Sequence, residues 1–336
     1  MSTIETATSA RHGGARPNLV ALTGAAGFLG RFVCEALVRE ERWRCRALVR
    51  PGEDPKALPR ERCEVVVGDL RSLEDVRGLV RGTEAVVNLA FWRGGSADYN
   101  LAAARNVERA CREAGIRRLV HCSTAVVTGD FPGRDVTEET PCRAAGEYER
   151  IKLAIEELLH SSADEALRVT VVRPTAIFGA GGANLIKLAA GLRDGNRAVQ
   201  ALRSFIEGRR RMNLVPVRTV AAAVVFLLGR EPRHEFEVFI VSDDENPLNN
   251  YGDVERLIAG VYFPGRKLWR LRAPWWVLAF LLRVMGRSHV DPRREYRCDR
   301  LIEAGFSKPV DFAEEVGRFA RFFSSEGTVG QGATGP

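Results

Sequence analysis

The chain has 336 residues, of which 45% are hydrophobic and 28% charged, and it carries a formal net charge of +7. These proportions indicate an ordinary globular protein that can bury a large core without disulfides or metal ions to stabilise it. The positive charge comes mostly from arginine, and no nucleic-acid-binding module accompanies it, so nucleic-acid binding is not expected. The charge indicates either a solvated basic surface or a cleft that attracts phosphorylated ligands.

Seven cysteines are spread along the chain without a CxxC pair or a metal-ligand spacing. Most lie in apolar runs, so we expect reduced core residues, no disulfides and no metal site. Residues 1–17 lack the apolar core of a signal peptide, and both they and residues 326–336 should be disordered tails. The apolar run from Ala273 to Met285 is too short to span a bilayer. We therefore expect a cytoplasmic protein without a membrane span.

Short β-rich runs alternate with helical patterns from Asn18 onwards. Near-continuous apolar runs of this kind are typical of parallel strands buried on both faces. Repeated β–α–β units of this kind predict an α/β fold, a doubly wound parallel (Rossmann) sheet with its ligand crevice at the carboxyl ends of the strands. The predicted strands are NLVALTG, RCRALV, CEVVVGD, EAVVNLA, RRLVHCST and RVTVVRP, and the predicted helices include 30–40, 72–80 and 102–114.

This alternation of strand and helix patterns ends after Pro174. A returning strand is predicted over Glu237–Val241, and helices are predicted near 251–260, 275–285 and 311–323. We expect a dinucleotide-binding domain made of residues 18–178 plus 214–241. A smaller, mainly C-terminal substrate-binding part should comprise residues 179–213 plus 242–325.

The first predicted strand runs directly into the sequence TGAAGFLG and then into an amphipathic helix. Gly24 permits the tight turn, Gly27 lets backbone amides approach a pyrophosphate, and Gly30 lets the helix lie close to the strand. A glycine triplet at the first strand–helix junction of a parallel α/β pattern predicts a dinucleotide site. Its expected cofactor contacts are Gly24, Gly27, Phe28, Leu29 and Gly30.

Tyr148 and Lys152 form a YxxxK pair on a predicted helix, where the i, i+4 spacing places both side chains on one face. A free phenol has a pKa near 10 and is a poor base at neutral pH. A neighbouring ammonium, or the positive charge of an oxidised nicotinamide, lowers that pKa. Tyr148 is thus a candidate acid/base for hydride transfer at a secondary alcohol or ketone, and both residues are also candidate cofactor contacts.

Together the TGxxGxxG turn and the YxxxK pair resemble the extended short-chain dehydrogenase/reductase family, of the NAD-dependent epimerase/dehydratase type. The strand end HCSTAVVTG resembles the family motif S-[ST]-x-x-V-Y-G, with Thr128 in place of the tyrosine. The resemblance implies that Thr124 binds the substrate oxygen, with Ser123 as the alternative. It also implies that Asn100, in a segment resembling N-x-x-G-T-x-N, braces the active-site helix.

Further segments resemble other motifs of the family and follow the order that those motifs have in the family, over about residues 18–325. They imply adenine contacts from Asp69 and Leu70, a border to the cofactor formed by Leu89 and Ala90, and closure over the nicotinamide near Pro174. The family's dehydratases have T-D-E where this chain has Thr-Ala-Val, so dehydration is disfavoured. The resemblance also implies a homodimer through helices near 98–114 and 146–162.

The second strand ends at Arg50, where NAD-binding proteins usually place an acid that bonds the ribose hydroxyls. A guanidinium there can bind a 2′-phosphate, and Arg46 on the same strand face could add to it. The alternative is an ordinary surface arginine. We therefore predict NADP as the cofactor, with NAD as the alternative.

The substrate is less closely defined. Arginines crowd residues 193–211 where the family binds sugar nucleotides, and Asn184 and Arg209 are candidate diphosphate contacts. A solvated arginine face explains the same pattern. The leading hypothesis is an epimerase or reductase of a nucleotide sugar. An NADPH-dependent reductase of an apolar ketone or aldehyde is the alternative, which Trp275 and Trp276 would favour if they face the cleft, and a non-catalytic NADP sensor is the third.

Overall fold

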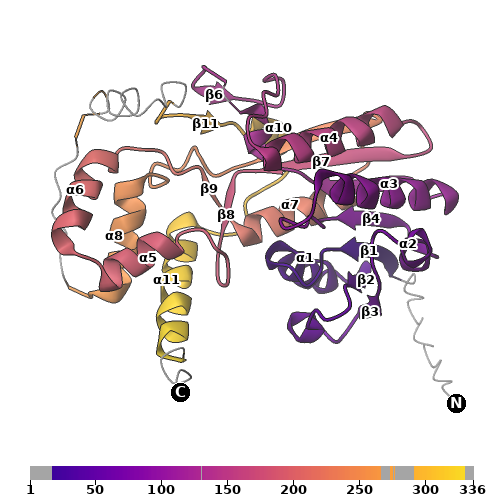
Figure 1. Cartoon of the computed structure of the whole chain (residues 1–336), viewed down its shortest axis with the longest axis horizontal. Coiled ribbons are helices and arrows are strands. Elements are labelled where there is room, and N and C mark those ends of the chain that lie inside the picture. Colours follow the sequence, from indigo (N-terminus) through magenta and orange to yellow (C-terminus); the bar gives the residue numbers. More distant parts are fainter. Residues whose placement is uncertain (1–16, 130, 266–272, 275, 277–290, 330–336) are drawn as a thin grey trace, which may run out of the picture.

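The computed structural model describes residues 17–129, 131–265, 273–274, 276 and 291–329. Its main element is a fully parallel seven-stranded sheet in the order β10-β7-β5-β4-β1-β2-β3, shown in Figure 1. All six strands predicted before Pro174 and the returning strand are present, which confirms the doubly wound Rossmann-type sheet. The strands are β1 (Asn18–Thr23), β2 (Trp43–Val49), β3 (Cys63–Val67), β4 (Ala85–Asn88), β5 (Arg118–Cys122), β7 (Arg168–Pro174) and β10 (Phe236–Val241).

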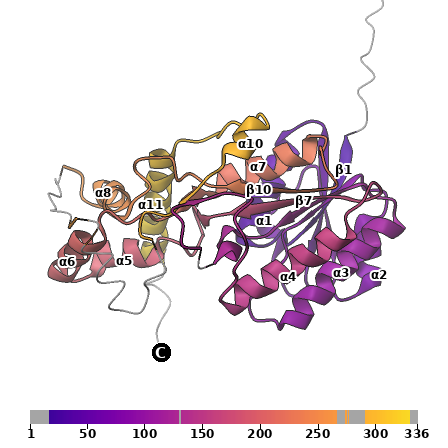
Figure 2. The ribbon, with the colours of Figure 1, turned by 90° about the horizontal axis from the view of Figure 1, so that it is seen from above.

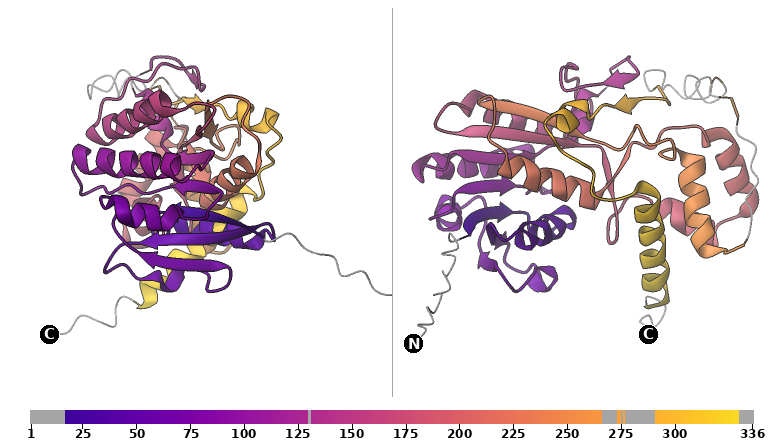
Figure 3. Two further views of the ribbon diagram at one scale, coloured as in Figure 1. Left: turned by 90° about the vertical axis from the view of Figure 1, so that its right-hand side faces the viewer. Right: turned by 180° about the vertical axis from the view of Figure 1, so that it is seen from behind.

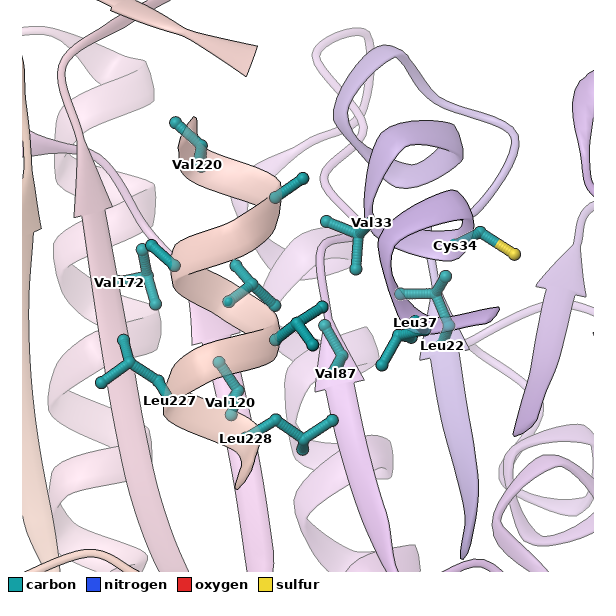
Figure 4. Packing of buried hydrophobic residues seen from close by; sticks show 14 of the residues in the cluster. Leu22, Val33, Cys34, Leu37, Val87, Val120, Val172, Val220, Leu227 and Leu228 are labelled. Carbon is teal, nitrogen blue, oxygen red and sulfur yellow. The ribbon is translucent and has the colours of Figure 1, made fainter. Parts of the chain in front are cut away.

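Helices cover the two faces of the sheet, as Figure 2 shows. One face carries α1 (Phe28–Arg39) and α7 (Val217–Gly229), and the other carries α2 (Leu73–Val80), α3 (Ala97–Glu113) and α4 (Glu147–Ser162). Helix α7 is buried along most of its length because it packs against the strands and against α1 beside it, and Figure 4 shows Val220, Leu227 and Leu228 packed in that layer. Helix α3 begins five residues before its predicted start because the Ser96 hydroxyl caps it by accepting from the Tyr99 amide.

Strand β3 departs from the prediction of a fully buried strand. It is an edge strand of the sheet, and Val65 and Val67 are exposed. The sequence CEVVV indicated burial because three consecutive valines are typical of a central strand. At the edge, however, β3 has only β2 as a neighbour. The prediction that this run is buried was therefore wrong, although the strand itself is where it was expected.

Beyond the sheet, a second apolar core lies among α5 (Ile186–Asp194), α8 (Tyr251–Tyr262) and α11 (Phe312–Val329), and α6 (Arg197–Glu207) lies against α5 and α8. The right-hand view of Figure 3 shows this helical part beside the sheet. The predicted helices near 251–260 and 311–323 are thus present, and the one near 275–285 lies outside the described residues. Helix α11 continues four residues into the segment 326–336 that we expected to be a disordered tail.

Two short parallel ladders and several short turns complete the described fold. Strand β8 (Ala176–Phe178) pairs with β9 (Leu214–Pro216), and β6 (Asp135–Val136) pairs with β11 (Glu295–Tyr296). Both ladders join segments far apart in sequence, so they tie the helical part to the sheet. The remaining elements are η1 (Pro55–Ala57), η2 (Ala125–Thr128) and α10 (Asp299–Glu303). None of the described helices is long and apolar enough to cross a membrane.

Candidate functional site

The glycine turn between β1 and α1 has the geometry that its sequence predicts. Gly24 has a φ of +68°, and a Cβ there would lie 2.9 Å from the backbone nitrogen of Ala90. Gly27 is exposed and forms the N-cap of α1, so the first turn of that helix presents unpaired amides to the crevice. A Cβ on Gly30 would lie 2.0 Å from the Gly24 carbonyl oxygen. The turn therefore has room for an anion only because these positions have no side chains.

Gly30→Ala should destabilise the protein by about 1–3 kcal/mol or more, because the added methyl group overpacks the turn. Gly78→Ala is the matched control within a helix, since nothing lies within 4 Å of its added Cβ. That substitution should stabilise the protein by about 0.5–1 kcal/mol. Urea unfolding of both variants measures the difference, and equal effects of the two substitutions would contradict the close approach at Gly30.

The loop that follows β8 closes over the start of α1. A Cβ on Gly182 would lie 2.5 Å from the tip of the Phe28 ring, and Arg31 donates a 3.1 Å hydrogen bond to the Ala180 carbonyl. Leu29, the next residue of α1, is half-buried beneath the same turn. Phe28 thus supports the closing loop from below, while Pro174 is buried at the end of β7.

Tyr148 and Lys152 lie in the first turns of α4, at the carboxyl end of the sheet. Lys152 is only 3% exposed, and its Nζ donates a 2.8 Å hydrogen bond to the Cys122 carbonyl at the end of β5. That ammonium also lies 4.7 Å from the centre of the Phe91 ring, which packs edge-on against Tyr148 at 5.0 Å. Phe91 therefore joins the two residues of the YxxxK pair into one packed unit.

Burial shifts the pKa of both groups. Desolvation lowers the pKa of Lys152, because the charged ammonium is buried. Desolvation is also the largest influence on Tyr148 and raises its pKa, whereas the Arg93 charge and a hydrogen bond with Thr124 lower it. In the protein without cofactor, Tyr148 therefore remains a protonated phenol at neutral pH.

Thr124 and Ser123 follow β5 directly, and the structure brings Thr124 to Tyr148 as expected. Both residues are buried, with exposed fractions of 8% and 3%. The Ser123 hydroxyl has no hydrogen-bond partner among the described residues. It is therefore available to a bound molecule, so the structure keeps both hydroxyls as candidates for the reacting oxygen.

Asn100 braces a different part of the site from the one that we expected. Its amide group donates to the carbonyls of Trp92 and Ser96, and its oxygen accepts from the Trp92 amide at 2.9 Å. These bonds fix the loop after β4 rather than α4. The loop carries Arg93, whose guanidinium lies 4.8 Å from the centre of the Tyr148 ring. Asn100 thus acts on the tyrosine only through this loop.

Sequence reasoning missed Arg93 and Phe91. Both follow β4 at the carboxyl edge of the sheet, and they line a cavity of about 410 Å³ beside Tyr148 together with Glu147 and Ile151. The position of an aromatic and an arginine directly after a strand was the only available signal. Their packing against the tyrosine depends on how the loop folds back.

A chain of buried side chains crosses the strands beneath the site. Thr23, Asn88 and His121 are register partners on β1, β4 and β5, and hydrogen bonds of 2.6 and 3.2 Å join them in this order. Burial, with a smaller contribution from Lys152, lowers the pKa of His121 well below its usual value. The imidazole is therefore neutral, and the network locks the strand ends that position Thr124 and Lys152. Leu89 and Ala90 lie just beyond it, where the Ala90 amide donates to the Thr23 hydroxyl.

Two arginines converge on Tyr99 at the other end of the crevice. The Arg71 guanidinium lies 5.0 Å from the centre of the Tyr99 ring, and a hydrogen bond with Tyr99 is one of the influences that raise the pKa of Arg50. Arg50 also forms a 2.6 Å ion pair with Glu53, and Arg71 pairs with Asp69 at 2.8 Å. The Arg71 pair lowers the pKa of the Asp69 carboxyl. Two arginines, of which only Arg50 was predicted, thus meet near Tyr99, and each is paired with a carboxylate.

Leu70, which follows Asp69, is buried and fixed in place. Asn106 in α3 donates to the Leu70 carbonyl at 2.8 Å and to the Arg71 carbonyl at 2.9 Å. Arg46, by contrast, does not join this group. Its guanidinium pairs with Glu64 and donates to the carbonyls of Leu79 and Arg81. The expectation that Arg46 adds to a phosphate site is therefore wrong, because its side chain is held between β3 and the end of α2.

The candidate substrate residues lie apart from Tyr148. Asn184 donates its amide to the Ile177 carbonyl at 2.7 Å, Arg209 is exposed after α6, and neither lines the cavity beside Tyr148. Most of the arginines in the crowded stretch form ion pairs. The pairs are Arg193–Asp194, Arg203–Glu207, Arg210–Glu207 and Arg211–Glu295. Of the Trp pair, Trp275 lies outside the described residues and Trp276 is exposed.

The described residues fit a nicotinamide dinucleotide along this crevice. Gly24, Gly27 and Gly30 leave space for the pyrophosphate, and the Ser123 hydroxyl is an unpartnered polar group at the reacting end. Arg50 and Arg71 offer charge at the adenosine end. When bound, such a cofactor would donate or accept hydride, and Tyr148 and Lys152 would adjoin its nicotinamide half.

Comparison with known proteins agrees with this geometry. Residues 20–241 match the NAD dependent epimerase/dehydratase family. Sterol demethylase protein B of Methylococcus capsulatus is 29% identical over 231 residues, which are 64% of this chain and 67% of that protein. The 2-alkyl-3-oxoalkanoate reductase of Shewanella oneidensis is 31% identical over 49% of this chain and 46% of its own length. The chain thus spans about half to two thirds of these relatives.

Other similar proteins act on nucleotide sugars. The UDP-glucose 4-epimerase of Vibrio cholerae is 23% identical over 82% of this chain and 85% of its own. The structure of a UDP-N-acetylglucosamine 4-epimerase from Methanobrevibacter ruminantium, with UDP-N-acetylmuramic acid bound, has a TM-score of 0.71 at 17% identity, covering 92% of this chain and 99% of that one. The family match over residues 20–241, the glycine turn and the Tyr148–Lys152 pair lead to one conclusion: the chain belongs to the NAD dependent epimerase/dehydratase family of extended short-chain dehydrogenases/reductases.

Proposed function

We propose that this protein is an NADPH-dependent reductase that converts a ketone or aldehyde on an apolar molecule into an alcohol. The observation that carries the proposal is the pair of guanidiniums, Arg50 and Arg71, that converge on Tyr99 at the adenosine end of the crevice. A 2′-phosphate there would receive charge-assisted hydrogen bonds from both. NADPH is chiefly a donor of hydride in net reductions, so its selection favours a reductase over an enzyme that recycles its own cofactor.

NADPH, when bound, would supply the hydride, and the residues of the chain transfer the proton. Tyr148, a phenol of raised pKa without cofactor, donates its proton to the carbonyl oxygen as that oxygen becomes an alcohol. The hydroxyl of Thr124, with Ser123 beside it, holds the oxygen in line with the phenol. Lys152, fixed by the Cys122 carbonyl, stabilises the negative charge left on Tyr148.

An apolar substrate is supported by where the candidate diphosphate contacts lie. Arg209 does not line the cavity beside Tyr148, which Phe91 and Ile151 help to line. The Asn184 amide is bonded to backbone. The similar 2-alkyl-3-oxoalkanoate reductase acts, by its name, on a ketone of an alkyl chain. That likeness covers about half of each chain, so it supports the substrate class alone.

The second candidate is a nucleotide-sugar epimerase, favoured by the similarity to UDP-glucose 4-epimerase over 82% of the chain. An epimerase reduces and reoxidises one cofactor within a turnover and can hold it tightly. The decisive experiment is to denature the purified protein and identify the released nucleotide and its stoichiometry by mass spectrometry. Near-stoichiometric NAD would overturn the reductase proposal. Empty protein or substoichiometric NADP would support it.

A panel of ketones and aldehydes follows, with NADPH consumption recorded at 340 nm. Alkyl and polycyclic ketones should be reduced, and UDP-sugars should not be epimerised. Tight NADPH binding with no turnover on any substrate would instead favour the third hypothesis, a non-catalytic sensor. We also propose a homodimer through α3 and α4, which lie side by side on one face of the sheet (Figure 2). Light scattering of the purified protein in solution measures the mass of the assembly.

Arg93→Ala should move the alkaline limb of the pH profile to higher pH. Reduction needs the protonated phenol, so kcat/KM falls as pH rises through the pKa of Tyr148. The Arg93 charge lowers that pKa, and its removal raises it. Arg105→Ala, which changes an exposed arginine of α3, is the control and should leave the profile in place. An alkaline limb at the same pH in both variants would show that Arg93 does not act on the tyrosine.

A further inference from the structure

Three cysteines that are distant in sequence meet on the α1 side of the sheet. Cys34 comes from α1, Cys45 from β2 and Cys63 from β3, and their sulfur atoms all lie within 4.8 Å of one another. The Sγ atoms of Cys34 and Cys63 are 3.4 Å apart. Cys45 and Cys63 are register partners on adjacent strands, and Figure 4 shows the Cys34 sulfur turned away from α7. The three thiols therefore converge at one point rather than lining up along one strand.

The ligand set selects the kind of ion. Thiolate sulfur is soft and selects ions such as Cu(I) and Zn(II). Structural zinc sites are almost always tetrahedral with four protein ligands and Zn–S distances of about 2.3 Å. No histidine, carboxylate or fourth cysteine completes this group among the described residues. Three sulfur atoms satisfy the trigonal coordination of Cu(I) without a further ligand, so the set fits Cu(I) better than zinc.

The surroundings suit a buried ion with one route of entry. Cys34 and Cys45 are buried, with exposed fractions of 0% and 1%, and they pack with Trp43 in the apolar core. Cys63 is half-buried on the edge strand β3, so an exchanging ligand can reach it.

We propose that Cys34, Cys45 and Cys63 bind one Cu(I) ion as a three-sulfur site. Binding displaces protons from the thiols, so the affinity falls as the pH is lowered. The ion would fasten α1, which carries the glycine turn, to β2 and β3. Loaded protein should therefore unfold at a higher temperature than copper-free protein. This site is separate from the Tyr148 region and does not depend on the proposed reductase activity.

The test is an anaerobic titration of the reduced full-length protein with Cu(I) against a coloured Cu(I) chelator. One ion per chain should be withdrawn from the chelator, and Cys63→Ser should abolish that binding. Cys142→Ser, which changes another half-buried cysteine outside the group, should bind as the wild type does. An equal loss of Cu(I) binding in both variants, or no Cu(I) binding by the wild type, would overturn the proposal.

A second measurement on the unmodified chain covers the case of a variant that fails to fold. Cu(I) should protect Cys63 from alkylation, as mapped by mass spectrometry, while the labelling of Cys142 stays unchanged. Unprotected Cys63 in the presence of Cu(I) would overturn the site. Preferential binding of Zn(II), or a disulfide between Cys34 and Cys63 that persists after reduction, would also overturn it.

Discussion

Tyr148→Phe should lower the kcat for ketone reduction by about 10²–10⁴-fold, the usual contribution of a positioned acid. The phenyl ring keeps the edge-on packing against Phe91 but has no proton to donate. NADPH binding should persist, because Lys152 and the glycine turn remain in place. Steady-state kinetics and fluorescence titration with NADPH separate the two effects.

Tyr262→Phe is the matched control, since it removes the same hydroxyl from a tyrosine of α8 in the helical part. Its kcat should stay unchanged, because Tyr262 packs against the apolar core of the helical part and does not line the cavity beside Tyr148. A Tyr148→Phe protein with near-wild-type turnover would remove Tyr148 from the chemistry. Thr124, which shares a hydrogen bond with it, would then be the next acid to replace.

Arg50→Ala should weaken NADPH binding by about tenfold or more and leave NADH binding unchanged. A hydrogen bond to a charged group contributes about 1.5–3 kcal/mol, and 1.4 kcal/mol corresponds to a factor of ten in affinity. The Arg50 side chain is 44% exposed, so the lower end of that range applies. Dissociation constants for both cofactors, measured at one fixed ionic strength, give the selectivity directly.

Two further variants make this result specific. Arg44→Ala removes an exposed arginine near the other end of β2, and it should not alter selectivity. Glu53→Gln removes the acid that pairs with Arg50 and should strengthen NADPH binding. If Arg50→Ala lowered the affinity for NADH as much as that for NADPH, the arginine would not recognise a 2′-phosphate.

The sequence by itself determined the sheet, the glycine turn and the YxxxK pair. Each follows from local spacing: apolar runs set the strands, three glycines set the turn, and the i, i+4 interval sets Tyr148 and Lys152 on one face of a helix. The seven strands and the helices α1, α2 and α8 accordingly lie close to their predicted positions. Such features survive folding because tertiary contacts reinforce a pattern that is already present in the chain.

Only the tertiary structure decided what the long side chains contact. Arg46 was expected to bind a phosphate, but its guanidinium pairs with Glu64. Asn100 was expected to brace α4, but its side chain holds the loop after β4. Arg93 and the meeting of Cys34 with Cys63 had no signal in the spacing. An arginine can reach partners in several directions, and contacts between residues tens of positions apart depend on the packing of whole elements. Local periodicity carries neither kind of information, which is why the backbone was predictable and these contacts were not.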